Sequence, residues 1–183
     1  MAPTQAQTQP RSLSGSFRSD PVHSSFGFAI THSGISTYRA AFTDADATLV
    51  AGEDGVALEG SAAVESVTIT EPPEFRAHAL GPEFFDAERH PRITFRSRDV
   101  ELADDGSARV SGELEIRGVA RPVSATGTWA VAPGSGRVAL ELEAVVDRRE
   151  FGIDWQMEAP GGGDILGYEV TITVSLELVP EEG

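Results

Sequence analysis

One stretch of the sequence, residues 76–95, combines helix-type spacing with bulky aromatic residues, two histidines and several arginines. This stretch and the residue that follows it contain the candidates for binding a ligand head group, which are Arg76, His78, Arg89, Arg92 and Arg96. Guanidinium groups hold a phosphate or diphosphate through paired hydrogen bonds, which makes this segment a candidate site for such a head group. The alternative is that the arginines form surface ion pairs with Glu83, Asp86 and Glu88, which contribute little stability.

The four histidines are the other side chains that could do chemistry, as metal ligands. His23, His32, His78 and His90 match no familiar zinc spacing, and the first two share neither a helix nor an alternate-residue register. For His78 and His90 we favour a structural hydrogen-bonding role. The chain has no cysteine, so no thiolate ligand supplements them. We therefore predict no metal site and no cofactor.

Nucleophilic and acid–base catalysis find no support in the sequence. The run His23-Ser24-Ser25 is not a nucleophile elbow, because no serine sits in a strained strand-to-helix turn. The carboxylates are scattered along faces that we expect to be exposed, so no pair is set up for acid–base work. We predict no catalytic residues and a protein that is not an enzyme; a metal-using or cofactor-using enzyme built on the four histidines is the hypothesis opposed to this.

Charge and composition exclude several classes of partner. The chain of 183 residues has a formal net charge of −15, which repels nucleic acid and anionic surfaces, and all 14 basic residues are arginine. No run approaches the roughly 18 apolar residues that a membrane span requires, so we expect no stable membrane insertion. Residues 1–14 are rich in Gln, Thr, Pro and Ser and lack the apolar region of a signal peptide. We expect a disordered tail there and a cytoplasmic protein.

From Gly15 onward the apolar residues recur with a period of two, which is typical of β-strands. The pattern predicts strands over residues 15–18, 23–32, 38–51, 56–70 (with a β-bulge near 65–66), 92–102, 107–117, 123–131, 137–146 and 167–178. A short helix over 74–80 and a helical turn over 83–87 interrupt them. One-faced strands joined by hairpin-length turns favour an antiparallel sheet that closes on itself. The predicted fold is all-β: about eight antiparallel strands in one barrel over residues 15–179, with a short helical insertion near the middle and a C-terminal tail over 180–183.

The expected interior contains many small residues as well as Leu and Val, among them Gly112, Ala125, Gly127 and Ala144. An eight-stranded barrel has room either for packed side chains or for one small ligand. Small inward residues leave space for a ligand; the alternative is that they fit the taper of a solidly packed barrel. Phe84 and Phe85 point about 100° apart on a helical turn, so one ring can plug the barrel, or both can anchor the insertion.

Four blocks resemble the YceI-like family of polyisoprenoid-binding proteins. They are residues 20–28 followed by His32, residues 76–86 with 90–97, residues 112–123, and residues 147–155. This resemblance implies a bacterial, lipocalin-like barrel that holds a long isoprenoid or a related lipid, such as a quinone, in its interior. It alone suggests a homodimer. Family members are often secreted or periplasmic, and the chain departs from them in its lack of a signal peptide and in the proline-rich connection over 71–75.

A long isoprenoid needs a dry tunnel, in which each buried methylene contributes about 0.8 kcal/mol. The predicted lining is Phe26, Phe28, Ile30, Phe42, Phe84, Phe85, Phe95, Val110, Leu114, Trp129, Leu140, Leu142, Val170, Ile172 and Val174. For each residue taken singly, plain core packing is the alternative. We predict a non-enzymatic lipid carrier or storage protein; the alternative is a stress-related interaction module whose barrel is solid and whose insertion docks a partner.

Overall fold

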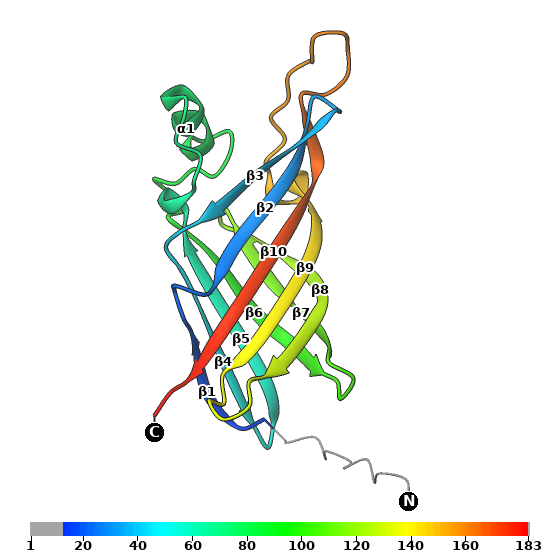
Figure 1. Cartoon of the computed structure of the whole chain (residues 1–183). Helices are drawn as coiled ribbons and strands as arrows, with labels where there is room; N and C mark the ends of the chain where they lie inside the picture. The colour runs from blue at the N-terminus through cyan, green and yellow to red at the C-terminus, as the bar shows by residue number, and fades with distance from the viewer. Residues whose placement is uncertain (1–12, 183) are drawn as a thin grey trace, which may run out of the picture.

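The computed structural model describes residues 13–182 and shows ten strands, one α-helix and two short 3-10 turns (Figure 1). The strands are β1 (Gly15–Ser19), β2 (Ser25–His32), β3 (Ser36–Phe42), β4 (Ala45–Gly52), β5 (Gly55–Ala63), β6 (Arg92–Leu102), β7 (Ser107–Ile116), β8 (Val119–Val131), β9 (Val138–Asp147) and β10 (Leu166–Pro180). The helix α1 spans Pro73–Leu80, and the turns η1 and η2 span Val64–Ser66 and Arg148–Phe151.

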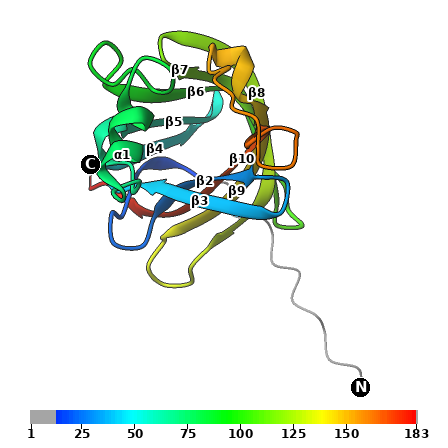
Figure 2. The same ribbon diagram turned by 90° about the horizontal axis from the view of Figure 1, so that it is seen from above.

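Eight of the strands form a closed ring. β1 pairs with β4, the strands β4 to β10 follow in chain order, and β10 pairs back onto β1 (Figure 2). All of these pairings are antiparallel. β2 and β3 add a further hairpin on β10, beyond the part of β10 that pairs with β1. The predicted eight-stranded antiparallel barrel is therefore confirmed.

The strand predicted over 123–131 begins earlier, at Val119, and two other predicted strands differ more strongly from the structure. The segment 38–51, expected as one strand, is divided at Thr43–Asp44 because β3 pairs with β2 whereas β4 pairs with β1 and β5. The segment 56–70, expected as a bulged strand, ends at Ala63 and continues as η1. Val64 and Val67 are both almost fully buried. A strand would turn residues three apart to opposite faces, whereas the 3-10 turn buries both.

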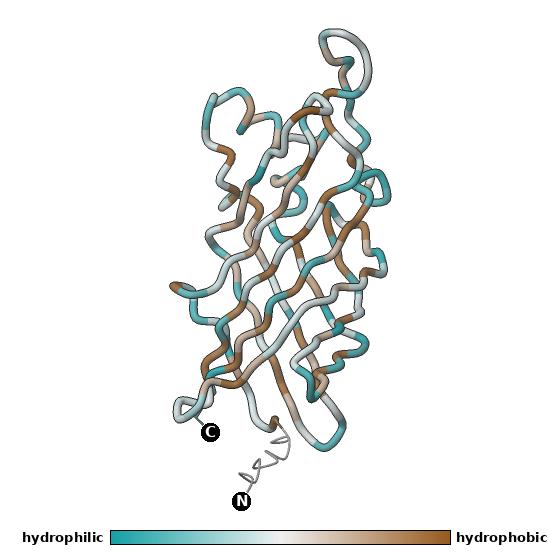
Figure 3. Tube along the Cα trace, turned by 45° about the vertical axis from the view of Figure 1, so that its right-hand side comes forward, coloured by the Kyte–Doolittle hydropathy of each residue, from teal (hydrophilic) through white to brown (hydrophobic). Residues whose placement is uncertain are grey.

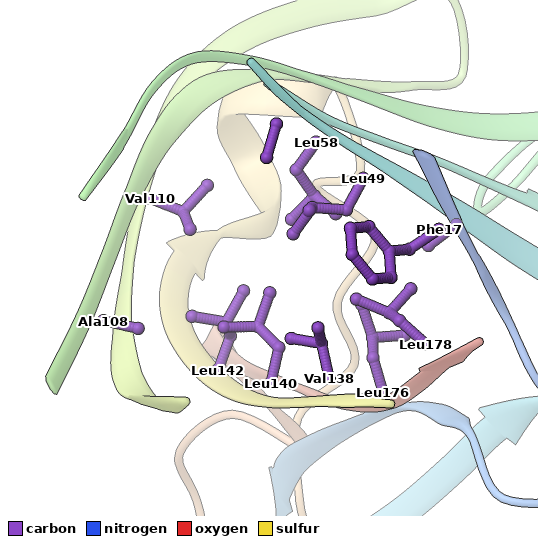
Figure 4. Packing of buried hydrophobic residues seen from close by; sticks show 12 residues of the cluster. Phe17, Leu49, Leu58, Ala108, Val110, Val138, Leu140, Leu142, Leu176 and Leu178 are labelled. Carbon is purple, nitrogen blue, oxygen red and sulfur yellow. The ribbon is translucent and has the colours of Figure 1, made fainter. Parts of the chain in front are cut away.

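The main hydrophobic core fills one end of the barrel, which we call the closed end. Its buried residues are Phe17, Ala47, Leu49, Ala51, Leu58, Ala108, Val110, Val138, Leu140, Leu142, Leu176 and Leu178. Their side chains converge from opposite walls (Figure 4). Hydrophobic and polar residues alternate along the strands that supply them (Figure 3), as expected for one dry and one wet face. Leu13, the first residue that the structure describes, packs against this core; residues 1–12 of the expected N-terminal tail lie outside the described residues.

The opposite end, which we call the mouth, is built from three connections. They are the β2–β3 turn, the segment 67–91 that carries α1 (the insertion), and the segment 148–165 (the β9–β10 loop), and all extend away from the chain ends (Figure 1). Pro73 begins α1, where its missing N–H costs no hydrogen bond. No helix within residues 13–182 has both the length and the apolar character needed to cross a membrane.

Close packing of β8 on β9 requires a glycine at position 127. A Cβ at Gly127 would overlap the backbone carbonyl of Glu141 on β9. We expect Gly127→Ala to lower the free energy of unfolding by about 1–3 kcal/mol, because the two strands must move apart. Gly52→Ala is the matched control, since a Cβ there meets no atom within 4 Å. Urea unfolding of both variants measures the difference; equal stabilities would contradict the close approach.

The junction between β1 and β2 carries an acid-sensitive cluster. Asp20 accepts hydrogen bonds from His23 Nδ1 (2.9 Å), Val22 N (2.9 Å) and Arg137 Nη1 (3.0 Å). The hydrogen bond to His23 is the largest of the contacts that hold the pKa of Asp20 well below its usual range. A depressed carboxyl pKa contributes stability above the pKa of the unfolded state, and this contribution is lost as pH falls.

Acid titration of the melting temperature tests this cluster. Below about pH 4, near the pKa of an unfolded aspartate, we expect the wild-type melting temperature to fall more steeply than that of Asp20→Asn, which has no carboxylate to protonate. Asp104→Asn, which removes an exposed carboxylate in the β6–β7 turn, serves as the control and should follow the wild type. Parallel curves for Asp20→Asn and the wild type would show that the cluster has no such effect.

Candidate ligand-binding cavity

A cavity of about 790 Å³ occupies the barrel between the core and the mouth. Leu58, Val110, Leu142 and Leu176 belong both to the core and to the cavity lining, so the packed closed end forms the floor. The volume lies within the range of about 300–1,000 Å³ that is usual for small-molecule sites. The barrel is therefore hollow over one part of its length and solid over the other.

Most of the predicted tunnel residues line this cavity. Those that do are Phe26, Phe28, Ile30, Phe42, Phe84, Phe85, Phe95, Val110, Leu114, Leu142, Val170, Ile172 and Val174. Trp129 and Leu140 do not. Leu140 is fully buried in the closed-end core. Trp129 packs against the same core and donates its indole N–H to the carbonyl of Ala103 at 2.8 Å. Both residues belong to the floor, because the strand pattern identifies the inward face but not the depth along the barrel.

Phe84 and its neighbour Phe85 belong to two different aromatic clusters. The ring of Phe85 packs edge-on against Phe28 (6.2 Å between centroids) and Phe42 (5.7 Å), and thus joins the insertion to β2 and β3. The ring of Phe84 packs instead against His78 (4.9 Å) and Trp155 (5.4 Å). Such pairs contribute about 0.5–1.5 kcal/mol beyond their buried area. Each ring therefore both lines the cavity and attaches the insertion to another part of the mouth.

His78 is the one head-group candidate that lies at the cavity. Its Nε2 is 2.9 Å from Glu83 Oε2, and its ring stacks edge-on against Trp155 at 4.8 Å. The imidazole thus stands between the insertion and the β9–β10 loop. The side chain is 37% exposed, so a group that leaves the cavity can reach it.

The four arginine candidates lie away from the cavity lining. Arg76 turns its guanidinium onto the carbonyls of Glu65 (2.7 Å), Val67 (3.1 Å) and Ile69 (3.3 Å), which ties α1 to the segment before it. The other three form ion pairs: Arg89 with Asp86 (3.9 Å), Arg92 with Asp46 (3.4 Å) and Arg96 with Glu59 (3.1 Å). Arg92 and Arg96 alternate on β6 with Ile93 and Phe95, which line the cavity, so these arginines project from the outer face.

Sequence reasoning missed the lining supplied by the β9–β10 loop. Phe151, Ile153, Trp155, Met157 and Ile165 line the cavity, and the first four recur at every second residue, although the structure has no named strand between η2 and β10. A signal is present in the sequence, because these first four large apolar residues alternate with Gly152, Asp154 and Gln156, as on a segment that buries one face.

Arg148 organises this loop from within. It is buried and donates to the carbonyls of Ile153 (2.8 Å), Trp155 (2.9 Å) and Gly167 (2.9 Å). Burial lowers the pKa of its guanidinium, because water no longer stabilises the charge. The carbonyl partners offset part of that cost and fold the loop over the cavity.

A second arginine, in the β7–β8 turn, links two connections of the mouth. Arg117 and Gly118 form the two-residue β7–β8 turn, both with positive φ (55° and 70°), as a type I′ hairpin requires. The Arg117 guanidinium donates to Gly152 O at 2.5 Å and also to Pro82 O. One side chain therefore holds the insertion and the β9–β10 loop together.

Two of the four histidines, His32 and His78, line the cavity, whereas His23 and His90 do not. Within residues 13–182, the one group of three side chains with suitable spacing for a metal is Asp20, His23 and Glu177. It lies at the β1–β2 junction, and Arg137 already bonds both of its carboxylates (3.0 and 2.5 Å). A guanidinium placed between two carboxylates supplies the positive charge that a metal ion would bring.

Comparison with known proteins identifies the family. The model of the YceI-like domain matches residues 17–178, nearly the whole barrel. The chain belongs to the YceI-like family. A UPF0312 protein of Staphylococcus aureus strain USA300 is 27% identical to this YceI-like chain over 169 residues, which cover 88% of this chain and 95% of that protein.

Solved structures show the same YceI-like fold at lower sequence identity. BcnA of Burkholderia cenocepacia superimposes with a TM-score of 0.72 at 21% identity, over 89% of this chain and 99% of that one. A domain from Saccharophagus degradans, described as a polyisoprenoid binding domain implicated in plant cell wall breakdown, gives 0.70 at 12% identity, over 90% and 98%. The YceI protein of Campylobacter jejuni gives 0.62 at 22% identity, over 84% and 91%. At these identities the likeness establishes the fold.

The bridge made by Arg117 can be tested by hydrogen exchange. We expect Arg117→Asn to speed amide exchange at Phe85, Asp86 and Ile153 by about tenfold or more, because a hydrogen bond to a charged group contributes about 1.5–3 kcal/mol. Asparagine tolerates the positive φ of this position. Arg121→Ala is the control, since that guanidinium donates to Ala120 O on its own strand. Unchanged exchange in both mouth segments would contradict the bridge.

Proposed function

We propose that this YceI-like protein binds one long-chain isoprenoid or a related amphiphilic lipid in its barrel, as a carrier or storage protein without enzymatic activity. The observation that carries the proposal is the cavity of about 790 Å³, whose lining is almost wholly apolar and whose floor is closed. An apolar chain gains about 0.8 kcal/mol for each methylene removed from water, so such a space retains it without specific polar contacts.

The family supports the choice of ligand class. The Saccharophagus degradans domain with the same fold is described as binding polyisoprenoids. The cavity has the other property that such a ligand needs, because its walls are formed by Phe, Leu, Ile and Val side chains from eight strands and the insertion. The alternative of a solidly packed interaction module predicts no internal space and is disfavoured by a cavity of this size.

We place the polar end of the ligand at the mouth. The closed end is packed with hydrocarbon side chains, whereas the mouth has Tyr38 and His78 in the lining. Burying a head group against the core would leave its hydrogen bonds unmade, which costs several kcal/mol. This orientation assigns His78 a contact with the head group; Arg76, Arg89, Arg92 and Arg96 gain no support from their positions. A homodimer and a cytoplasmic location stay predictions.

Extraction of the purified protein tests the proposal. Organic extracts of the wild type, made before and after incubation with a C20 prenyl alcohol, are analysed by mass spectrometry for lipid per mole of protein. We expect close to one lipid per chain. Ala144→Phe should lower this content severalfold, because Ala144 lines the cavity and the larger side chain fills it.

Val145→Phe is the matched control for the extraction. Val145 is the next residue on β9 and faces outward, with 56% of its surface exposed, so the same added ring should leave lipid content unchanged. Circular dichroism confirms that both variants are folded. Wild-type protein that stays empty after incubation, or equal lipid content in the two folded variants, would refute a ligand in the barrel.

A further inference from the structure

Large apolar side chains are exposed around the mouth, one on each of its three connections. Ile35 in the β2–β3 turn is 88% exposed, Phe75 on α1 is 64% exposed, and Met157 in the β9–β10 loop is 54% exposed. Tyr38 on the neighbouring strand β3 is 42% exposed. We call these four residues the apolar rim. Burial of such side chains is favourable, so a rim left open to water is a candidate interaction surface.

The rim is continuous with the cavity. Tyr38, Phe75 and Met157 line the cavity as well as being exposed. Ile35 lies in the β2–β3 turn, which is joined to the β9–β10 loop by the hydrogen bond from Ser33 N–H to Ile165 O (2.7 Å). The other large apolar residues exposed within residues 13–182 are Val22, Val50, Val131 and Val145, and none of them lines the cavity. Single exposed valines of this kind are normal on a protein surface. The gathering at the mouth is a distinct feature.

The charged residues around the apolar rim indicate which kind of partner surface can bind there. α1 and the residues before it expose Glu71 and Glu74, while Arg76, the one arginine of α1, turns its guanidinium onto backbone carbonyls. The β9–β10 loop exposes Glu158 and Asp164. Arg39 on β3 and Arg89 in the insertion are exposed basic residues at this end. The insertion nevertheless has five carboxylates against two arginines, and the β9–β10 loop has four against two, so the border is net acidic and repels an anionic membrane. It also disfavours a second copy of this chain placed mouth to mouth, because two such borders would face each other and each chain has a formal charge of −15.

We propose that the apolar rim docks on the surface of a zwitterionic lipid bilayer, and that the ligand passes directly between bilayer and cavity. The proposal rests on the lipid-binding function above. Each methylene exposed to water lowers the population of the exposed state about fourfold, so a long chain that left the protein through water would transfer very slowly. Contact between the apolar rim and the bilayer removes that step. The acidic border tolerates phosphocholine head groups, which carry no net charge.

Transfer kinetics distinguish docking from diffusion through water. The protein is loaded from detergent micelles with a dansyl-labelled C20 prenyl alcohol, the detergent is removed, and the loss of the probe to phosphatidylcholine vesicles is followed by fluorescence. We expect the rate to rise with vesicle concentration, as a collision requires, and to fall when phosphatidylglycerol replaces part of the phosphatidylcholine. Added salt should reverse that fall, because it screens the acidic border.

Substitutions at the rim locate the docking surface. We expect Ile35→Ser and Phe75→Ser each to slow transfer by about tenfold, because each removes one of the exposed apolar contacts. Ile35 does not line the cavity, so its variant should take up the probe from micelles as fully as the wild type. Val22→Ser, at a residue that is 80% exposed near the closed end, is the control and should transfer at the wild-type rate.

The possible results distinguish failure of bilayer docking from failure of the lipid-binding function. A rate independent of vesicle concentration, or equal rates for Ile35→Ser, Phe75→Ser and Val22→Ser, overturns docking while the lipid-binding function stands. A concentration-dependent dimer that Ile35→Ser abolishes also overturns docking, since it makes the rim a surface between two copies. Failure of the wild type to load any probe from micelles refutes the lipid-binding function itself.

Discussion

The pairing of β10 with three other strands is the constraint on which the barrel depends. One edge of β10 bonds to β9 from Glu169 to Leu178, while the other bonds to β2 over its first part and to β1 over its last. The β1 contact closes the eight-stranded ring around the core, so no strand edge is left open there. Beyond it, β2 and β3 continue the wall without closing a ring, and the connections of the mouth complete the enclosure (Figure 1).

The unequal filling of the barrel follows from which residues face inward at each level. Near the closed end, Leu49, Leu140 and Leu178 are fully buried and fill the space between the walls (Figure 4). Nearer the mouth, small residues such as Ala125 and Ala144 face the cavity. Close packing of side chains at the closed end makes a stable core. The unfilled space nearer the mouth lacks van der Waals contacts, which a bound apolar chain can supply. The same strands thus stabilise the fold at the closed end and line the ligand cavity nearer the mouth.

The sequence predicts the wall of this protein better than its mouth. Alternation along β7, β9 and β10 identifies the inward residues correctly because side chains on a strand must alternate. The alternation does not give the depth of a residue along the barrel, and for this reason it predicts Leu140 in the tunnel lining together with Leu142. Arg76 and Arg148 show a second limit: each binds backbone carbonyls of a neighbouring segment, and no sequence pattern records which carbonyls the fold brings within reach.

The position of Arg117 bears on the order in which the protein assembles. Its two acceptors, on Pro82 and Gly152, are each 35 residues away along the chain, one before and one after. The β7–β8 hairpin is local and can form early, whereas the two segments that meet on its turn must first be brought there by the strands around them. We infer that the mouth matures last and opens first, as a partly independent unit above a barrel that stays folded.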